Sequence, residues 1–353
     1  MGNKVRVLIV DDSSLVRKSL REGLDADAEI EVVGTARDPY VARDLLVKLR
    51  PDVITLDVEM PRMDGVTFLR KYMEVLPTPT VMISSLTESG RSITMDALEA
   101  GAVDIVSKPR IGLVEQFPEM MEEVCLRVKA AAQADMDHFK KVRDTQVERV
   151  SEPKKRTQAL EESTDKVIAI GASTGGVEAL ARILPAFPAA SPGIVIVQHM
   201  PEGFTTSFAE RLNNISSLKV KEAESGDRIV PGQVLLAPGG KRHMEVRRTG
   251  GQYKVQLREG EKVTFNRPSV DVLFDSVAQQ VGRNATAVLM TGMGRDGAKG
   301  LRAIRDAGGR TFAQNKATSV IYGMPQEAVS LGAAEKELAL ERIPEALIKA
   351  ARA

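Results

Sequence analysis

Short, uninterrupted apolar runs alternate with segments of helical periodicity along most of this chain, and this rhythm restricts its possible folds more than any other feature. Over residues 1–110 the runs are rich in Val, Ile and Leu and do not alternate with polar residues. A parallel sheet needs such runs, because helices bury both of its faces. The sequence therefore predicts a doubly wound (βα)5 domain. The expected strands are Val5–Val10, Glu31–Gly34, Val53–Leu56, Thr80–Ser84 and Val103–Val106, and the expected helices include Leu15–Leu24, Tyr40–Leu49 and Arg91–Ala100.

The same rhythm returns after residue 165 and predicts a second doubly wound, mostly parallel α/β domain. Between its βα units, residues Leu218–Phe265 carry short alternating runs and Gly/Pro turns, which indicate an antiparallel β excursion. The expected strands are Val167–Gly171, Ile194–Gln198 and Thr286–Met290, and the expected helices are Val177–Leu184, Thr205–Leu212, Val270–Val281, Ala298–Ala307 and Ile343–Ala351.

A charged segment poor in large apolar residues separates the two rhythms. With 353 residues the chain is long enough for two domains, each with its own core. We expect domains at residues 1–125 and 165–353, joined by a linker over residues 126–164. The front of this linker is predicted to continue a helix from the first domain. The basic triplet Lys154–Arg156 is interpreted as part of an exposed linker, with a nucleic-acid patch as the alternative.

Composition excludes several classes of function. The 49 basic and 48 acidic residues nearly cancel, which argues against a coat for nucleic acid or for an anionic membrane. Cys125 is the single cysteine, so no internal disulfide can form, and three histidines leave little scope for a His-based metal centre. No run approaches the roughly 20 apolar residues of a membrane span. The N-terminal run ends in two aspartates and lacks a signal-peptide cleavage site. We expect a soluble cytoplasmic protein without direct membrane insertion.

Five polar side chains lie at the carboxyl ends of the first domain's expected strands, where open α/β sheets form their sites. Asp11 and Asp12 follow the first strand and Asp57 ends the third, while Ser84 and Lys108 follow the fourth and fifth. Clustered carboxylates repel one another unless a hard cation such as Mg²⁺ neutralises them. A carboxylate beside Mg²⁺ can accept a phosphoryl group, which a hydroxyl and an ammonium can then bind. The alternative is that Asp11 and Asp12 are helix N-caps and that Lys108 lies at the surface.

These residues resemble the receiver domain of two-component response regulators. The resemblance covers residues 4–125 and rests on the segments 10–13, 57–65 and 107–109. It implies that Asp57 is the phospho-acceptor, and that Asp11, Asp12, Asp57 and the backbone carbonyl of Glu59 surround Mg²⁺. It further implies that Ser84 and Lys108 sense the phosphate.

Residues Gly171–Gly175 match the pattern G-x-S-x-G, a strand-to-helix turn in which small neighbours expose the nucleophile Ser173. The following helix N-terminus would favour a developing oxyanion. The pattern alone is weak, because a glycine-rich turn after a strand could equally hold a nucleotide phosphate. Neither common nucleotide-binding glycine motif is present, however.

His199 directly follows the next strand, and Asp296 lies just past the strand predicted at Thr286–Met290. Each alone is more often structural, but carboxyl ends of parallel strands meet at one sheet edge. Histidine can take the serine proton, and a carboxylate can fix its tautomer and stabilise the imidazolium. His243 is a weaker candidate for the base. Its alternative role is to line the pocket.

The whole chain apart from the linker resembles the chemotaxis protein-glutamate methylesterase (CheB) family. The matching segments are 171–176, 198–201, 237–240 and 291–297. The resemblance implies Ser173 as nucleophile, His199 as base and Asp296 as its orienting acid. The backbone N–H of Met293 would contribute to the oxyanion hole.

The implied activity is hydrolysis of glutamate γ-methyl esters on methyl-accepting chemoreceptors, which releases methanol, with deamidation of receptor glutamines as a related activity. The implied phosphodonor is a histidine kinase of the chemotaxis system. Mg²⁺ would serve the receiver domain alone, and the esterase chemistry would need no cofactor. We expect phosphorylation to regulate the hydrolase. Two alternatives are a DNA-binding response regulator, disfavoured by the charge balance and the missing helix-turn-helix, and a nucleotide-binding output domain.

Overall fold

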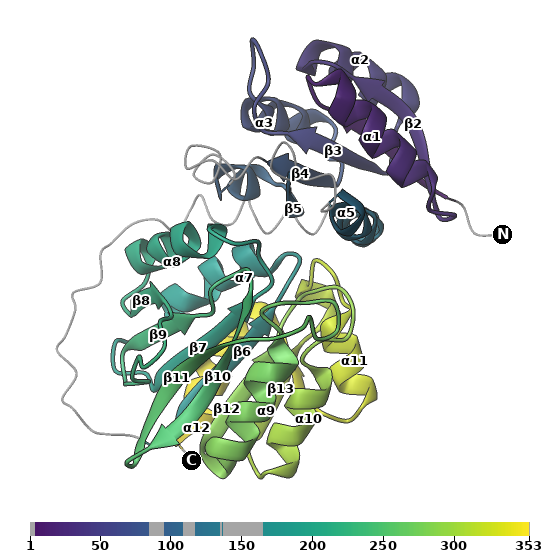
Figure 1. The fold of residues 1–353 in the computed structure, drawn as a ribbon. Coiled ribbons are helices and arrows are strands. Elements are labelled where there is room, and N and C mark those ends of the chain that lie inside the picture. Colours follow the sequence, from purple (N-terminus) through teal and green to yellow (C-terminus); the bar gives the residue numbers. More distant parts are fainter. Residues whose placement is uncertain (1–3, 85–94, 109–116, 135, 137–164, 353) are drawn as a thin grey trace. The chain divides into compact units, whose positions relative to one another are not determined.

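The computed structural model describes residues 4–84, 95–108, 117–134, 136 and 165–352 (Figure 1). The chain divides into two compact units, Met1–Asp144 and Thr145–Ala353. Most of the predicted linker, including Lys154–Arg156, lies outside the described residues. Helix α5 (Phe117–Ala131) crosses residue 125, so the front of the predicted linker is helical.

The first unit contains a five-stranded parallel sheet of order β2-β1-β3-β4-β5. The (βα)5 prediction is confirmed, and two strands have the expected bounds. In this order β1 and β3 are neighbours, so the residues that follow them meet at one edge. The strands are β1 (Val5–Val10), β2 (Ile30–Ala36), β3 (Val53–Asp57), β4 (Thr80–Ser84) and β5 (Asp104–Ser107).

Side-chain caps start three helices of this unit. Ser13, Asp38 and Asp64 accept backbone N–H bonds at the starts of α1, α2 and α3. The cap of α1 is therefore Ser13, which excludes the alternative that Asp11 or Asp12 caps it. Residues 95–100 are helical, while the first part of the helix predicted at Arg91–Ala100 lies outside the described residues. The capped helices are α1 (Ser14–Asp25), α2 (Pro39–Leu49) and α3 (Gly65–Val75).

The second unit is built on a seven-stranded parallel sheet of order β14-β13-β12-β6-β7-β9-β8. Its three central strands are fully buried, as continuous apolar runs predict. The strands are β6 (Val167–Ala172), β7 (Gly193–Gln198), β8 (Lys219–Glu222), β9 (Gln233–Leu236), β12 (Ala285–Leu289), β13 (Arg310–Gln314) and β14 (Lys336–Leu338).

The antiparallel part of the second unit is shorter than the range Leu218–Phe265 predicted from the sequence. Only β10 (Arg242–Thr249) and β11 (Gln252–Glu259) pair antiparallel, as a separate two-stranded sheet. The strands β8 and β9 pair in parallel and extend the main sheet. The short alternating pattern of β8 arises because β8 lies at the edge of the sheet, where one of its faces is more exposed than the other.

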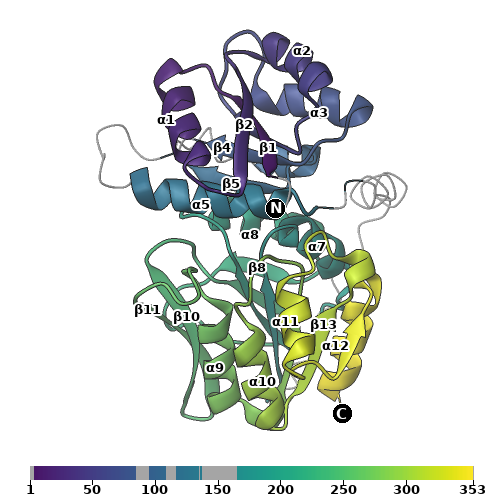
Figure 2. The same cartoon turned by 90° about the vertical axis from the view of Figure 1, so that its right-hand side faces the viewer.

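Helices cover both faces of the seven-stranded sheet. Figure 1 shows α9 and α10 on one side and α8 on the other, and Figure 2 shows α9 and α10 side by side. Within the described residues no helix is long and apolar enough to cross a bilayer. The helices are α7 (Gly176–Ile183), α8 (Phe204–Ile215), α9 (Val270–Gln280), α10 (Ala298–Asp306), α11 (Met324–Ser330) and α12 (Ile343–Arg352).

Candidate active site and phospho-acceptor pocket

Ser173 lies in a tight turn between β6 and α7 that leaves no room for larger neighbours. Gly175 has φ +78° and caps α7, a conformation that favours glycine. A Cβ at Gly176 would lie 2.1 Å from the side-chain oxygen of Gln198. The Ser173 backbone N–H donates to the carbonyl of Thr291, at 3.0 Å. The small residues of the motif are therefore required by packing at this turn.

The ends of β6 and β7 bring Ser173 and His199 next to each other. The His199 N–H donates to the carbonyl of Ala172 at 3.1 Å. The Gln198 Nε2 amide donates to the Ser173 carbonyl at 2.9 Å and to the His199 carbonyl at 3.1 Å. The sequence analysis did not predict that Gln198 holds these two turns together. Its position at the end of a strand, directly before His199, could have indicated this role.

His199 and Asp296 form a buried pair. The His199 Nε2–H donates to Asp296 Oδ2 at 2.8 Å, and the two side chains are 3% and 0% exposed. Because Nε2 bonds the carboxylate, Nδ1 is the imidazole nitrogen available to a serine hydroxyl. Burial alone would raise the pKa of Asp296, but the hydrogen bond and charge of His199 and the amide of Val270 hold that pKa below its usual value.

The loop after β12 must cross the end of β6 to reach His199. Strand order places β12 on one side of β6 and β7 on the other, yet Asp296 bonds His199 beyond β7. Asp296 also accepts the N–H groups of Val270 and Asp271 at the start of α9, at 2.8 and 3.1 Å. The start of α9 therefore holds the carboxylate that the loop delivers.

Met293 follows a glycine that packs directly on the Ser173 turn. A Cβ at Gly292 would lie 2.7 Å from the Cβ of Ser173, so only glycine allows this approach. The Thr291 hydroxyl donates to the carbonyl of Thr174 at 3.0 Å and fixes the two turns together. The residue before Met293 therefore packs on the Ser173 turn, and the role of the Met293 N–H as an oxyanion donor stays a prediction.

The structure gives no hydrogen bond for the Ser173 hydroxyl in the described part of the chain, and it places His243 away from the predicted role of base. The Ser173 hydroxyl makes no hydrogen bond among the described residues, so its bond to His199 stays a prediction. Within the described residues, the hydrogen bonds of His243 go to Glu261 and Ser269 and not to Ser173. Its Nε2–H donates to the carbonyl of Glu261 at 2.8 Å, and its Nδ1 accepts from Ser269 N–H at 3.1 Å.

In the first unit the predicted acidic residues meet at one edge of the sheet. Oxygens of Asp11, Asp12 and Asp57 lie within 4.8 Å of one another. Asp11 and Asp57 are buried, at 1% and 4% exposure, whereas Asp12 is exposed. A Cβ at Gly65 would lie 2.0 Å from the Asp57 carbonyl oxygen, so that glycine lets α3 start against the end of β3.

Lys108 reaches into this cluster. Its Nζ lies 2.8 Å from Asp11 Oδ2 and 2.7 Å from Asp57 Oδ2, and its backbone N–H donates to the Ser84 carbonyl at 2.7 Å. Burial raises the pKa of Asp57 to about 6; the Lys108 ammonium opposes this shift and the Asp11 charge adds to it. The alternative that Lys108 is a surface residue is therefore wrong.

The pocket suits a hard divalent cation. Three carboxylates face one ammonium, which leaves an excess of negative charge. Within the described residues, buried Asp11 Oδ2 has the Lys108 ammonium as its partner, at 2.8 Å. Oxygen ligands such as carboxylates are those that Mg²⁺ prefers. A cation bound there would compensate the excess negative charge.

Comparisons with known proteins match both halves of the chain. The CheB methylesterase model matches residues 168–347, and the response regulator receiver domain model matches residues 7–115. A protein-glutamate methylesterase/protein-glutamine glutaminase of Syntrophotalea carbinolica is 55% identical, over 97% of this chain and 96% of its own. A second such protein, from Pseudomonas aeruginosa, is 54% identical, over 98% of this chain and 97% of its own. The crystal structure of the Thermotoga maritima CheB methylesterase catalytic domain superposes with a TM-score of 0.51 at 42% identity, covering 52% of this chain and 97% of that one.

Proposed function

The chain belongs to the CheB methylesterase family, and on that premise we propose that it hydrolyses glutamate γ-methyl esters on chemoreceptors and releases methanol. The observation that carries this proposal is the buried His199–Asp296 pair beside the Ser173 turn, at 2.8 Å. Curated relatives at 55% and 54% identity bear the names of both activities, so we extend the proposal to deamidation of receptor glutamines.

The chemistry follows from the roles of the three side chains. His199 takes the proton of the Ser173 hydroxyl as the serine oxygen attacks the ester carbonyl, and Asp296 stabilises the imidazolium that forms. The oxyanion accepts a hydrogen bond from the Met293 N–H, an interaction typically worth about 2.7–4 kcal/mol in such sites. Methanol leaves with the proton from His199, and an acyl-enzyme remains.

Water then clears the acyl-enzyme. His199 takes a proton from the water as its oxygen attacks the acyl carbonyl, and returns that proton to the Ser173 oxygen. The products are free Ser173 and a glutamate side chain on the receptor. For a glutamine substrate the leaving group of the first stage is ammonia in place of methanol. No cofactor takes part in these steps.

We further propose that phosphorylation of Asp57 regulates the hydrolase. Residues 1–125 would form the receiver domain, 126–164 the linker and 165–353 the catalytic domain. A histidine kinase of the chemotaxis system would supply the phosphoryl group, and Ser84 and Lys108 would bind its oxygens.

Asp11, Asp12, Asp57 and the Glu59 carbonyl would hold Mg²⁺. The cation, when bound, neutralises charge during phosphoryl transfer. In the pocket itself, the Lys108 ammonium pairs with the buried carboxylates of Asp11 and Asp57. It would therefore lie close enough to bind a phosphoryl group on Asp57.

The proposal is tested by methanol release from methylated receptor, with and without a small-molecule phosphodonor. Ser173→Ala should abolish release, whereas Ser191→Ala should leave it within about twofold, because the Ser191 hydroxyl only donates to the Pro188 carbonyl outside the site. Asp57→Asn should keep basal release and lose the response to the phosphodonor.

Three outcomes would count against parts of this proposal. Full methanol release by Ser173→Ala would overturn the serine mechanism. An unchanged phosphodonor response in Asp57→Asn would overturn the regulation. Tight ATP binding that survives Ser173→Ala, together with no methanol release by the wild type, would favour the alternative that the Gly171–Gly176 turn holds a nucleotide phosphate.

A further inference from the structure

The carboxylate of the candidate triad has a partner that the proposed mechanism does not use. The Ser269 hydroxyl donates to Asp296 Oδ1 at 2.8 Å, while His199 bonds the other oxygen. Ser269 is fully buried and also caps α9, accepting from the Val272 N–H. Its hydroxyl therefore links the start of α9 to the group that orients His199.

The Ser269 backbone is fixed in turn by His243. The Ser269 N–H donates to His243 Nδ1 at 3.1 Å, and His243 Nε2–H donates to the Glu261 carbonyl at 2.8 Å. Because Nδ1 acts as acceptor and Nε2 as donor, this imidazole is held as the neutral tautomer with its proton on Nε2. His243 is 5% exposed, so both of its nitrogens are committed inside the protein.

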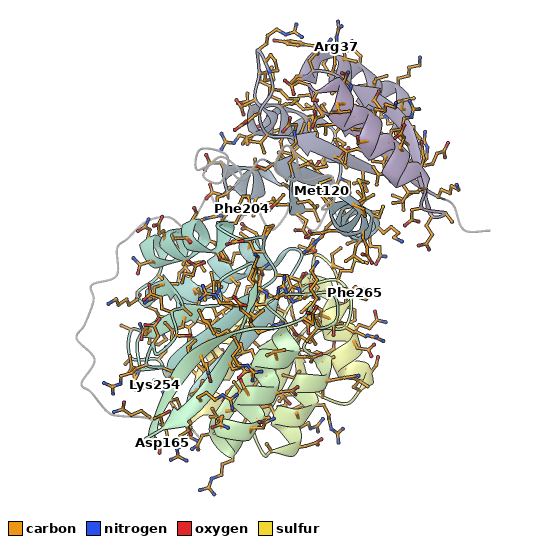
Figure 3. All side chains as sticks on the ribbon, in the orientation of Figure 1. Arg37, Met120, Asp165, Phe204, Lys254 and Phe265 are labelled. Carbon is orange, nitrogen blue, oxygen red and sulfur yellow. The ribbon has the colours of Figure 1, made fainter. Side chains whose placement is uncertain are left out.

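The segment before Ser269 is a loop that hydrogen bonds hold to the rest of the unit. It comes from a surface loop in which Phe265 is 72% exposed (Figure 3). Arg267 ties this loop back through two bonds, from Nε to the Gly240 carbonyl at 2.9 Å and from Nη1 to the Gly260 carbonyl at 2.8 Å. The contacts therefore run from an exposed loop through His243 and Ser269 to Asp296.

We propose that Ser269 and His243 are positioning residues for the triad: His243 fixes the Ser269 backbone, and the Ser269 hydroxyl fixes the Asp296 carboxylate that orients His199. This inference rests on the proposed function of the triad. A hydroxyl donor also stabilises the charge of the carboxylate, so its removal makes Asp296 hold a proton more strongly. The other titratable groups that face Asp296 are His199 and, on α9, Asp271 and Asp275.

The test compares full-length variants in methanol release from methylated receptor across a pH series. Ser269→Ala should lower kcat about 10- to 100-fold with little change in KM, because misplaced catalytic groups cost rate more than binding. The acid limb of its kcat profile should move to higher pH. Ser269→Thr keeps the hydroxyl and should restore most of the rate. His243→Asn keeps an acceptor but loses the Nε2–H donor, and should lower kcat by a smaller factor.

Ser276→Ala is the matched control. Ser276 lies on the same helix, is buried, and accepts from the Val246 N–H while donating to the Leu273 carbonyl, so its removal costs similar hydrogen bonds without touching Asp296. We expect its kcat profile to keep the wild-type shape. Circular dichroism checks that every variant is folded.

The outcomes separate this inference from the proposed function. If Asp296→Asn abolishes release while Ser269→Ala matches Ser276→Ala in rate and pH profile, the positioning role is overturned and the triad stands. If Asp296→Asn retains full release, the triad itself fails. Should Ser269→Ala be unfolded, Ser269→Thr and His243→Asn still decide the question, because wild-type rates for His243→Asn together with a rate loss for Ser269→Thr would contradict the proposed chain of contacts.

Discussion

Asp296 accepts four hydrogen bonds, from His199, Ser269 and the N–H groups of Val270 and Asp271. Charge-assisted bonds of this kind hold a buried carboxylate in its ionised form. The carboxylate of Asp271 is also buried, and the backbone N–H of this residue is one of the four donors. Burial and the nearby Asp296 charge both oppose ionisation of Asp271.

Asp271 gives a stability prediction with a defined sign. Burial raises its pKa to about 6; the Gly300 N–H opposes this and the Asp296 charge adds to it. Because its folded-state pKa exceeds its unfolded one, Asp271 binds more protons in the folded protein between about pH 4 and 6, and its contribution to stability falls as pH rises through this window. Asp271→Asn keeps an acceptor for Gly300 N–H and removes the charge. It should recover on the order of 1–3 kcal/mol at pH 7 relative to wild type.

This prediction is measured by urea unfolding of the full chain at pH 4 and pH 7, followed by circular dichroism. Asp44→Asn serves as the control, because the Asp44 side chain is 70% exposed and should change stability little at either pH. An Asp271→Asn variant that is no more stable than wild type at pH 7 would show that ionisation of Asp271 does not destabilise the folded protein.

Gly65 permits the close contact between α3 and the end of β3, so we expect a strong effect of substitution there. An added Cβ would meet backbone atoms of Asp57, at 2.0 Å from the carbonyl oxygen, which cannot move without shifting Asp57. Gly65→Ala should cost about 1–3 kcal/mol of stability and most of the phosphorylation at Asp57.

The matched control is Gly23→Ala in the same unit. Its Cβ would meet the end of the flexible Met121 side chain, which can rotate away, and alanine favours the surrounding helix α1. Incorporation of phosphate from a small-molecule phosphodonor distinguishes the two variants. Equal incorporation by both would contradict the role given to Gly65.

At the scale of elements, the hairpin β10–β11 depends on its two-residue turn. Thr249 pairs with Gln252, and the intervening Gly250 and Gly251 have φ of 56° and 79°. Two positive φ values define the hairpin turn that matches strand twist and that Gly and Asn favour. A Cβ at Gly250 would meet no atom within 4 Å, so only backbone conformation opposes a side chain there.

We therefore expect Gly250→Val to destabilise the second unit by about 1–2 kcal/mol, because a β-branched residue strongly disfavours positive φ. Gly250→Asn should remain within about 0.5 kcal/mol of wild type, since Asn tolerates this conformation. Thermal unfolding monitored by circular dichroism measures both. Equal losses in the two variants would point to a requirement for glycine beyond backbone conformation.

At the scale of the whole molecule, the two sites use different chemistry in separate units. The receiver pocket gathers three carboxylates suited to a divalent cation, whereas the triad is assembled from a hydroxyl, an imidazole and a single carboxylate. Removal of Mg²⁺ should therefore separate them. With excess EDTA we expect basal methanol release to stay within about twofold of its normal rate, because no triad step uses a metal.

The same EDTA treatment should abolish phosphorylation of Asp57 and the response to a phosphodonor, and added Mg²⁺ should restore both. Asp12→Ala is the matched variant, because it removes an exposed carboxylate of the candidate metal pocket. Basal release that falls with EDTA in proportion to the loss of phosphorylation would contradict this separation.

Periodicity and motif position determined much of this protein from the sequence. Continuous apolar runs predicted both parallel sheets, because strands buried on two faces require them, and the strand-end positions of Asp11, Asp57 and Lys108 predicted the pocket that forms. No range was predicted for α3, α11, β13 or β14, and the pairing of β8 with β9 is parallel where the sequence predicted an antiparallel excursion. The short alternating run of β8 resembles a hairpin strand, and only its place at the edge of the main sheet defines its pairing.

Tertiary structure alone decided how the carboxylate reaches the imidazole. In the sequence, the position of Asp296 after a strand and the resemblance of segment 291–297 predicted its role but not its partners, His243 was only a weaker candidate, and Ser269 lay in no motif. The strand order sends the loop after β12 across β6, where the start of α9 supplies backbone N–H donors and the Ser269 hydroxyl to hold Asp296 against His199. Such contacts join residues far apart in the chain, so no local pattern encodes them. They exist because a buried charge must find its hydrogen-bond donors wherever the fold places them.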